Sequence, residues 1–208
     1  EENEKEREFI LQKDVKGVPA IVQGIIDCYF EENNTAYFAM DYVQGITFKK
    51  YILNQGGKIP WKEAYEKLLP IITALEEVHQ KGIIHRDISA DNIYISSDGT
   101  MKLLDFGAAR VHSLEKSQSL DVILKEGYAP YEQYMRRGKQ GPFTDVYALC
   151  ACFYMAATSY LPPDAPERKD ADHIASFSAM GVQIPADLER VIFKGLAVNA
   201  QDRYQNMT

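Results

Sequence analysis

Three short motifs, each with at least one acidic residue, follow one another along the middle of the chain. The first is His85-Arg86-Asp87 with Asn92 just after it, the second is Asp105-Phe106-Gly107, and the third is Ala129-Pro130-Tyr131-Glu132. Carboxylates accept protons in catalysis, and carboxylate and amide oxygens are the ligands that Mg²⁺ prefers. Turn formation explains each Asp or Asn singly, but it does not explain the ordered set. We therefore interpret the set as a site.

In this order and spacing, the three groups resemble the signature set of protein kinases: H-R-D-x-x-x-x-N, D-F-G and a variant of A-P-E. The resemblance implies a phosphotransferase that uses ATP and Mg²⁺ and acts on a serine or threonine hydroxyl of a protein substrate. It assigns Asp87 to orient that hydroxyl and accept its proton, and it assigns Asn92 and Asp105 to the metal. The form H-R-D-I-S-x-D-N is similar to a bacterial, Hanks-type branch of the family.

The same resemblance implies an α+β, two-lobed fold. Residues 1–43 are expected to form part of a β-rich small lobe up to the hinge, and residues 44–208 a mainly helical large lobe. Other residues take supporting family roles: His85 and Phe106 as a stacked pair, with Gly107 completing that motif; Arg86 as the partner of a phosphorylated loop; Asp145 as an acceptor for the catalytic-loop backbone; and Glu132 with Arg203 as a buried ion pair. Two solvated surface charges are the alternative for this last pair.

The segment Tyr37–Val43 resembles the strand that runs into the family's hinge, where the adenine of ATP binds. Met40 would lie behind the adenine, and the backbone of Asp41 and Val43 would hydrogen-bond to its edge. A buried edge strand with no role in nucleotide binding is the alternative.

Two parts of the family pattern are not found in this sequence: the phosphate-covering G-x-G-x-x-G loop, and the strand with the lysine of V-A-I-K. We therefore expect the chain to begin inside the first small-lobe helix and to be N-terminally incomplete. Glu8, which shares a helix face with Leu11 and Val15, would pair with that lysine, with Glu6 or a solvated charge as alternatives. A kinase-like scaffold without turnover is the second functional hypothesis, and a small-molecule phosphotransferase is the third.

The loop that follows Asp87 also departs from the family in its charges. Serine/threonine kinases usually place a lysine two residues after this aspartate, and tyrosine kinases an arginine four residues after it. Here those positions hold Ser89 and Asp91. We hypothesise that Lys125, just before Gly127, supplies the missing positive charge, with a solvated loop lysine as the alternative.

Residues 107–127 have weak periodicity, which predicts a loop. By the resemblance, residues 107–126 would form the activation segment of the family. Ser113, Ser117 and Ser119 are its candidate phosphosites, although short polar loops commonly contain serines. A phosphate added there would have Arg86 as its partner, as the resemblance implies.

Hydrophobic periodicity predicts the elements that carry these residues. We expect a helix over 3–15 and an antiparallel hairpin of strands 20–30 and 36–43. Further helices are expected from Thr47, as the cap, to Leu53 and from Pro60 to about Lys81, with short strands at 93–95 and 101–104 around an Asp-Gly turn. Residues 143–160 read as a buried helix capped by Thr144, followed by helices near 170–178 and over 185–196, the last with Pro185 as its first residue.

Composition narrows the class of protein. The net charge of −7 makes a nucleic-acid or anionic-membrane surface a poor hypothesis. No apolar stretch approaches the roughly 20 residues of a membrane span. The three cysteines, Cys28, Cys150 and Cys152, are an odd number with two of them only two residues apart, which does not indicate a disulfide framework. They suit a reducing cytoplasm, where we expect this chain. A longer, membrane-anchored protein is compatible with these observations.

Overall fold

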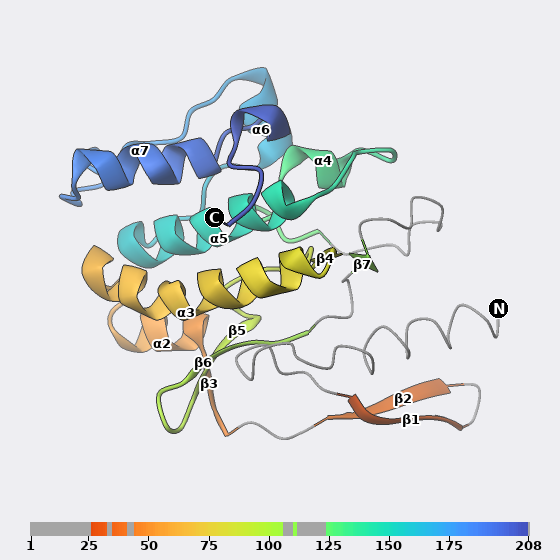
Figure 1. Ribbon diagram of the computed structural model, residues 1–208. Coiled ribbons are helices and arrows are strands. Elements are labelled where there is room, and N and C mark those ends of the chain that lie inside the picture. Colours follow the sequence, from red (N-terminus) through yellow and green to blue (C-terminus); the bar gives the residue numbers. More distant parts are fainter. Residues whose placement is uncertain (1–25, 33–34, 41–43, 106–109, 112–123, 208) are drawn as a thin grey trace.

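The computed structural model describes residues 26–32, 35–40, 44–105, 110–111 and 124–207 (Figure 1). The predicted helix over residues 3–15 lies outside the described residues. The rest combines short antiparallel sheets with a helical body, which is the α+β class expected from the sequence. The proposed division into lobes at residue 43 stays a prediction.

The predicted hairpin is confirmed. Strand β1 (Ile26–Glu32) pairs with β2 (Thr35–Met40) in an antiparallel sheet, in a register that sets Glu32 opposite Thr35. The strands run closer to the turn than the sequence indicated. A register shift lies between Ile26 and Cys28, next to the end of the pairing.

The helical body is built around α5 (Pro142–Thr158), which packs between α3 (Trp61–Gln80) and α7 (Ala186–Gly195) (Figure 1). Most side chains of α5 are buried, because helices cover it on two sides. This position explains its low polarity all round. Among the described residues, none of the helices combines the length and apolar character needed to cross a membrane.

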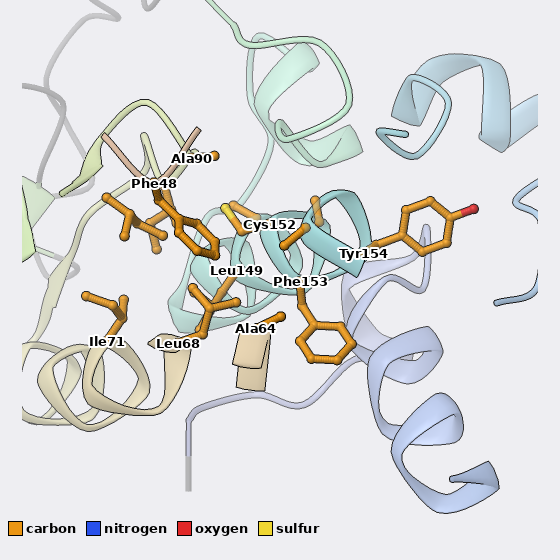
Figure 2. Packing of buried hydrophobic residues seen from close by; sticks show 14 of the residues in the cluster. Phe48, Ala64, Leu68, Ile71, Ala90, Leu149, Cys152, Phe153 and Tyr154 are labelled. Atoms are coloured by element: carbon orange, nitrogen blue, oxygen red, sulfur yellow. The ribbon is translucent and has the colours of Figure 1, made fainter. Parts of the chain in front are cut away.

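A hydrophobic core joins these helices to the short helix α2 (Phe48–Asn54), which Thr47 caps through a hydrogen bond from the Lys50 amide. Figure 2 shows Phe48, Leu68 and Leu149 directed toward one another from α2, α3 and α5. Full burial of one such side chain stabilises the fold by about 1.5–3 kcal/mol. Ile88 and Ala90 are also buried in this core, so the loop with the H-R-D motif is anchored to it.

Two small sheets frame the segments with the kinase-like motifs. Strand β5 (Ile93–Ser96) lies between β3 (Gly45–Thr47) and β6 (Met101–Leu103), and the turn from β5 to β6 contains Gly99 at a φ of 85°. Strand β4 (Ile83–Ile84) pairs with β7 (Arg110–Val111). Residues 85–92 connect β4 to β5, and the D-F-G motif begins two residues after β6, whose end pairs with the start of β5.

Three local predictions need correction. Thr144 does not cap α5: Gly141 is the N-cap, and the helix starts at Pro142, one residue before the predicted start, because the fixed φ of proline suits a first helical position. Thr144 instead accepts a hydrogen bond of 3.2 Å from the Gly141 amide. Pro185 is the residue before α7, rather than its first residue.

The helix predicted near 170–178 is wrong. The helix α6 is earlier, at Ala165–Asp170, and the following residues have no regular structure as far as Ser176. Phe177 explains the difference, because its fully buried ring packs edge-on against Phe153, Tyr154 and Phe193. This contact, rather than helix periodicity, holds the segment. The remaining short helices are α4 (Tyr131–Tyr134) and the 3₁₀ turn η2 (Ala200–Asp202).

Candidate active site

The loop that carries Asp87 is held by a buried carboxylate from α5. Asp145 accepts hydrogen bonds of 2.8 Å from the backbone amides of His85 and Arg86, one on each oxygen. Its side chain has no exposure to solvent. Arg86 adopts a φ of 71°, a strained value for a side chain of this size, and the two hydrogen bonds stabilise that conformation. The backbone contact expected of Asp145 is therefore present.

His79 is a member of this cluster that the sequence did not reveal. Its Nε2 lies 2.8 Å from an Asp145 oxygen, and its side chain is almost completely buried. Its Nδ1 has no hydrogen-bond partner among the described residues. In the sequence, a histidine in the last turn of a helix is explained by the helix dipole alone, so nothing marked His79 as a partner of Asp145.

His85 connects the Asp87 loop to the D-F-G segment. Its Nε2 lies 3.2 Å from the Leu104 carbonyl, and its Nδ1 accepts a hydrogen bond of 3.3 Å from the Asp87 amide. One nitrogen donates and the other accepts, which is the pattern of a neutral imidazole. Burial lowers the pKa of His85 below its usual 6.5, although the nearby Asp145 carboxylate opposes this shift. Phe106, its expected stacking partner, lies outside the described residues.

Asp87 and Asn92 are bound to each other. The Asn92 Nδ2 donates to the Asp87 backbone carbonyl at 2.7 Å and to its carboxylate at 2.8 Å. Both contacts use the nitrogen side of the amide, which leaves its oxygen for another partner. A backbone hydrogen bond of 2.8 Å from the Leu104 amide to the Asn92 carbonyl brings the chain just before Asp105 beside this amide.

This donor set fits Mg²⁺. An amide oxygen and the exposed carboxylate of Asp105 are hard oxygen ligands, and Mg²⁺ usually takes one or two such groups together with phosphates and water. Asp105 has a φ of 63°, an uncommon conformation that is frequent at functional sites. Within the described residues there is no group of three or more His, Cys, Asp or Glu side chains that could form a metal site without Asn92.

Lys125 reaches Asp87 from a different part of the chain. Its ammonium lies 3.1 and 3.2 Å from the two carboxylate oxygens of Asp87, and it donates a hydrogen bond of 3.0 Å to the Ser89 hydroxyl. The Lys125 and Asp87 side chains are 31% and 21% exposed, so solvent only partly screens the pair. The structure thus brings together the lysine and the aspartate that the sequence hypothesis joined.

The segment after Lys125 is fixed to the helical body at several points. Gln133 donates a hydrogen bond of 2.8 Å to the Arg86 carbonyl, and the Gly127 amide donates one of 2.7 Å to Asp164. Arg203 binds both oxygens of Glu132 at 2.7 and 3.0 Å, and both side chains are buried. The alternative of two solvated charges is therefore wrong, because this is a buried, bidentate ion pair.

Several predicted site residues lie outside the described residues: Glu8, Asp41, Val43, Phe106, Gly107, Ser113, Ser117 and Ser119. Met40 is described only in its backbone, at the end of β2 opposite Ile26. The structure therefore describes one part of the predicted site, the part that contains Asp87, Asn92, Asp105 and Lys125. A carboxylate next to a cation and to two oxygen ligands is a suitable arrangement for phosphoryl transfer.

Comparisons with known proteins agree with this geometry. The model of the protein kinase domain matches residues 1–204. The chain is 34% identical over 178 residues to the serine/threonine-protein kinase PknB of Mycobacterium tuberculosis, a match that covers 81% of this chain and 28% of that protein. It is 28% identical over 183 residues to the probable serine/threonine-protein kinase PknB of Lactococcus lactis, which covers 85% of this chain and 29% of that protein.

The chain thus spans less than a third of the length of these relatives. A solved structure described as "PpkA-294 apo form" superimposes with a TM-score of 0.77 at 30% identity, over 99% of this chain and 71% of that one. The matched family model covers nearly the whole sequence, including every motif discussed above. The chain belongs to the protein kinase domain family.

Proposed function

We propose that this domain transfers the γ-phosphoryl group of ATP to a serine or threonine hydroxyl of a protein substrate. The observation that carries the proposal is the setting of Asp87, whose carboxylate binds Asn92 on one side and Lys125 on the other. Phosphoryl transfer depends mainly on positioning and on stabilisation of charge. This group of residues offers both within one small site.

Asp87 is the proposed base. It would orient the substrate hydroxyl and accept its proton as the hydroxyl oxygen bonds to the γ-phosphorus. The bond from that phosphorus to the β–γ bridging oxygen breaks, and ADP leaves with the electron pair. The hydrogen bond from Asn92 and the contact with Lys125 hold the carboxylate in a fixed direction.

The cofactors in this proposal are ATP and Mg²⁺. Asn92 and Asp105 would hold the metal, and the chemistry that Mg²⁺ supplies when bound is neutralisation of charge on the phosphates. At the other end of ATP, Met40 and the backbone of Asp41 and Val43 would contact the adenine, as proposed from the hinge resemblance. Glu8 remains the proposed partner of a nucleotide-binding lysine.

The proposed partners are a protein substrate and ATP, and the proposed location is the cytoplasm. This location is supported by Cys150 and Cys152, which are free thiols among the cysteines whose side chains the structure describes. Burial raises the pKa of the Cys150 thiol to about 12, so this group stays protonated and unreactive there.

The direct test is transfer of radiolabelled phosphate from ATP in the presence of Mg²⁺, either to a generic protein substrate or to the protein itself. Asp87→Asn should lower kcat by a factor of about 100 or more, since loss of a catalytic base typically costs 10²–10⁴. Asp91→Asn is the matched control. It lies in the same loop, but its carboxylate is 44% exposed and pairs only with Lys49 among the described residues.

Lys125→Met should lower kcat strongly while nucleotide affinity stays near that of the natural sequence. Unchanged turnover would reject the role of Lys125 and leave that of Asp87 intact. Binding of ATP without transfer by the unsubstituted protein would instead favour the alternative of a kinase-like scaffold.

A further inference from the structure

Lys125 donates a hydrogen bond to Ser89, which lies two positions after Asp87. We infer that Ser89 is a positioning residue, which holds Lys125 against Asp87, so that the active-site cation comes from the segment before Gly127 and not from the loop of Asp87. This inference deepens the proposed function and rests on it. It names the residue that makes a distant lysine usable in the reaction.

The Lys125 ammonium contacts acceptors on two different side chains. An ammonium group has three donors and no fixed direction, so a single acceptor does not define its position. Here the acceptors lie on two side chains, the carboxylate of Asp87 at 3.1–3.2 Å and the hydroxyl of Ser89 at 3.0 Å. The hydroxyl therefore restricts where the charge lies along the carboxylate.

Ser89 is held in a fixed position by burial and by backbone hydrogen bonds. Ser89 is fully buried, and its carbonyl accepts hydrogen bonds from the amides of Asn92 at 3.0 Å and Ile93 at 3.1 Å. Ile88, its neighbour, is anchored in the hydrophobic core. A hydroxyl on such a fixed backbone is a defined acceptor, unlike the end of a long side chain in solvent.

Little space is free around Ser89 and Lys125. A cavity of about 10 Å³ lies between Asp87, Lys125 and Tyr128, which is room for about one water molecule. Ser89 does not line this cavity, but it is fully buried, so a longer side chain at position 89 would have to displace packed neighbours. Serine offers Lys125 a hydroxyl acceptor within that limited space.

The backbone of Lys125 is fixed at the other end of the side chain. Its carbonyl accepts hydrogen bonds from the amides of Tyr128 at 3.1 Å and Ala129 at 2.9 Å. The turn that follows Lys125 and the loop of Asp87 are thus joined through one side chain. Delivery of the cation to Asp87 requires that turn to be in place.

The first experiment compares kinetic effects in two backgrounds. Ser89→Ala should lower kcat about fivefold to tenfold, with the KM for ATP changed less than about twofold, because a misplaced charge affects the transition state more than ATP binding. In the Lys125→Met background, the same Ser89→Ala change should alter kcat by less than about twofold, because residues that act through one another are not additive. Ser89→Thr, which keeps the hydroxyl, should retain most of the activity.

Equal losses of kcat from Ser89→Ala in both backgrounds would overturn the inference and indicate a purely structural serine. Melting temperatures of all variants separate this from a loss of folded protein. An unchanged kcat in Ser89→Ala with natural Lys125 would overturn it as well.

The second experiment does not depend on activity. Trace acetylation with acetic anhydride, followed by mass spectrometry, reports how available each lysine amine is. Ser89→Ala should increase acetylation of Lys125 about threefold or more, and the reactivity of Lys49, an exposed lysine that pairs with Asp91, should not change. Unchanged acetylation of Lys125 overturns the inference even if the protein transfers no phosphate. Increased acetylation in a protein without transfer supports the positioning contact and rejects the proposed function alone.

Discussion

The carboxylate of Asp164 accepts a hydrogen bond of 2.7 Å from the backbone amide of Gly127, two residues after Lys125. Gly127 has a φ of 75°, and an added Cβ would lie 2.9 Å from both the Leu161 side chain and the Pro162 carbonyl. The loop before α6 therefore fits tightly against the turn that begins at Lys125. Asp164 fixes this turn from outside the active site.

Asp164→Ala should consequently lower kcat by about threefold to tenfold, because loss of a hydrogen bond to a charged group is worth about 1.5–3 kcal/mol and part of that loss falls on the Lys125 turn. The KM for ATP should change little. Steady-state kinetics checks this. Asp170→Ala is the matched control, since Asp170 is an exposed aspartate at the C-terminal end of α6, the helix that Asp164 precedes. Equal kinetics for the two variants would contradict the coupling of Asp164 to the active site.

Asp145 offers a second prediction, because it accepts three hydrogen bonds in a fully buried position. Asp145→Asn replaces one acceptor oxygen by a donor, which leaves a buried backbone amide facing an NH₂ group. The free energy of unfolding should fall by about 2–4 kcal/mol, because each unsatisfied buried polar group costs about 1–3 kcal/mol. Urea unfolding measures this loss.

His79→Gln is the companion variant to Asp145→Asn, because glutamine keeps a donor for the carboxylate and leaves both backbone hydrogen bonds intact. Its loss of stability should be less than half that of Asp145→Asn. A larger loss in His79→Gln would mean that the histidine, and not the backbone amides, is the main partner of Asp145.

The relation between Asp145 and His79 illustrates what the sequence could reveal and what it could not. Periodicity and capping predicted α2, α3 and the strands around Gly99, because these elements are determined by residues close in sequence. The contact of Asp145 with the loop backbone came from the resemblance to protein kinases. His79 lies 66 positions from Asp145, and its local sequence only indicates a helix end.

The same limit explains the error near residue 170. The position of Phe177 depends on rings from α5 and α7, which hydrophobic periodicity within residues 170–178 does not reveal. The hypothesis on Lys125 came from a missing charge near Asp87, so chemistry could suggest a partner for Asp87. The sequence could not indicate that Ser89 would be its second acceptor, because a buried serine in a loop has many ordinary roles.

The ion pair of Glu132 and Arg203 gives the third prediction. Arg203→Met leaves the Glu132 carboxylate buried without its cation, and the free energy of unfolding should fall by about 3–5 kcal/mol. Arg190→Met is the matched control, because Arg190 forms an ion pair with Asp187 in which both side chains are highly exposed, and such pairs contribute at most about 1 kcal/mol. Chemical denaturation of the two variants measures the difference, and similar losses would contradict a structural role of the buried pair.

His85 gives the last prediction, which concerns pH. Burial lowers its pKa in the folded protein below the 6.5 of the unfolded chain, and the carboxylates of Asp145, Asp87 and Asp105 partly oppose the shift. As the pH falls below 6.5, the unfolded chain takes up a proton before the folded protein does. The contribution of His85 to stability is therefore complete above pH 6.5 and is lost progressively below it.

Urea unfolding between pH 7.0 and pH 5.5 should show this loss, with a slope of at most about 1.4 kcal/mol per pH unit from one histidine. His85→Gln should remove that part of the slope, because glutamine has no proton to take up. His173→Gln, at an exposed histidine, is the matched control substitution. If the protein with the natural sequence and His85→Gln lost stability in parallel over this range, His85 would not be the neutral, buried imidazole that its contacts with Leu104 and Asp87 indicate.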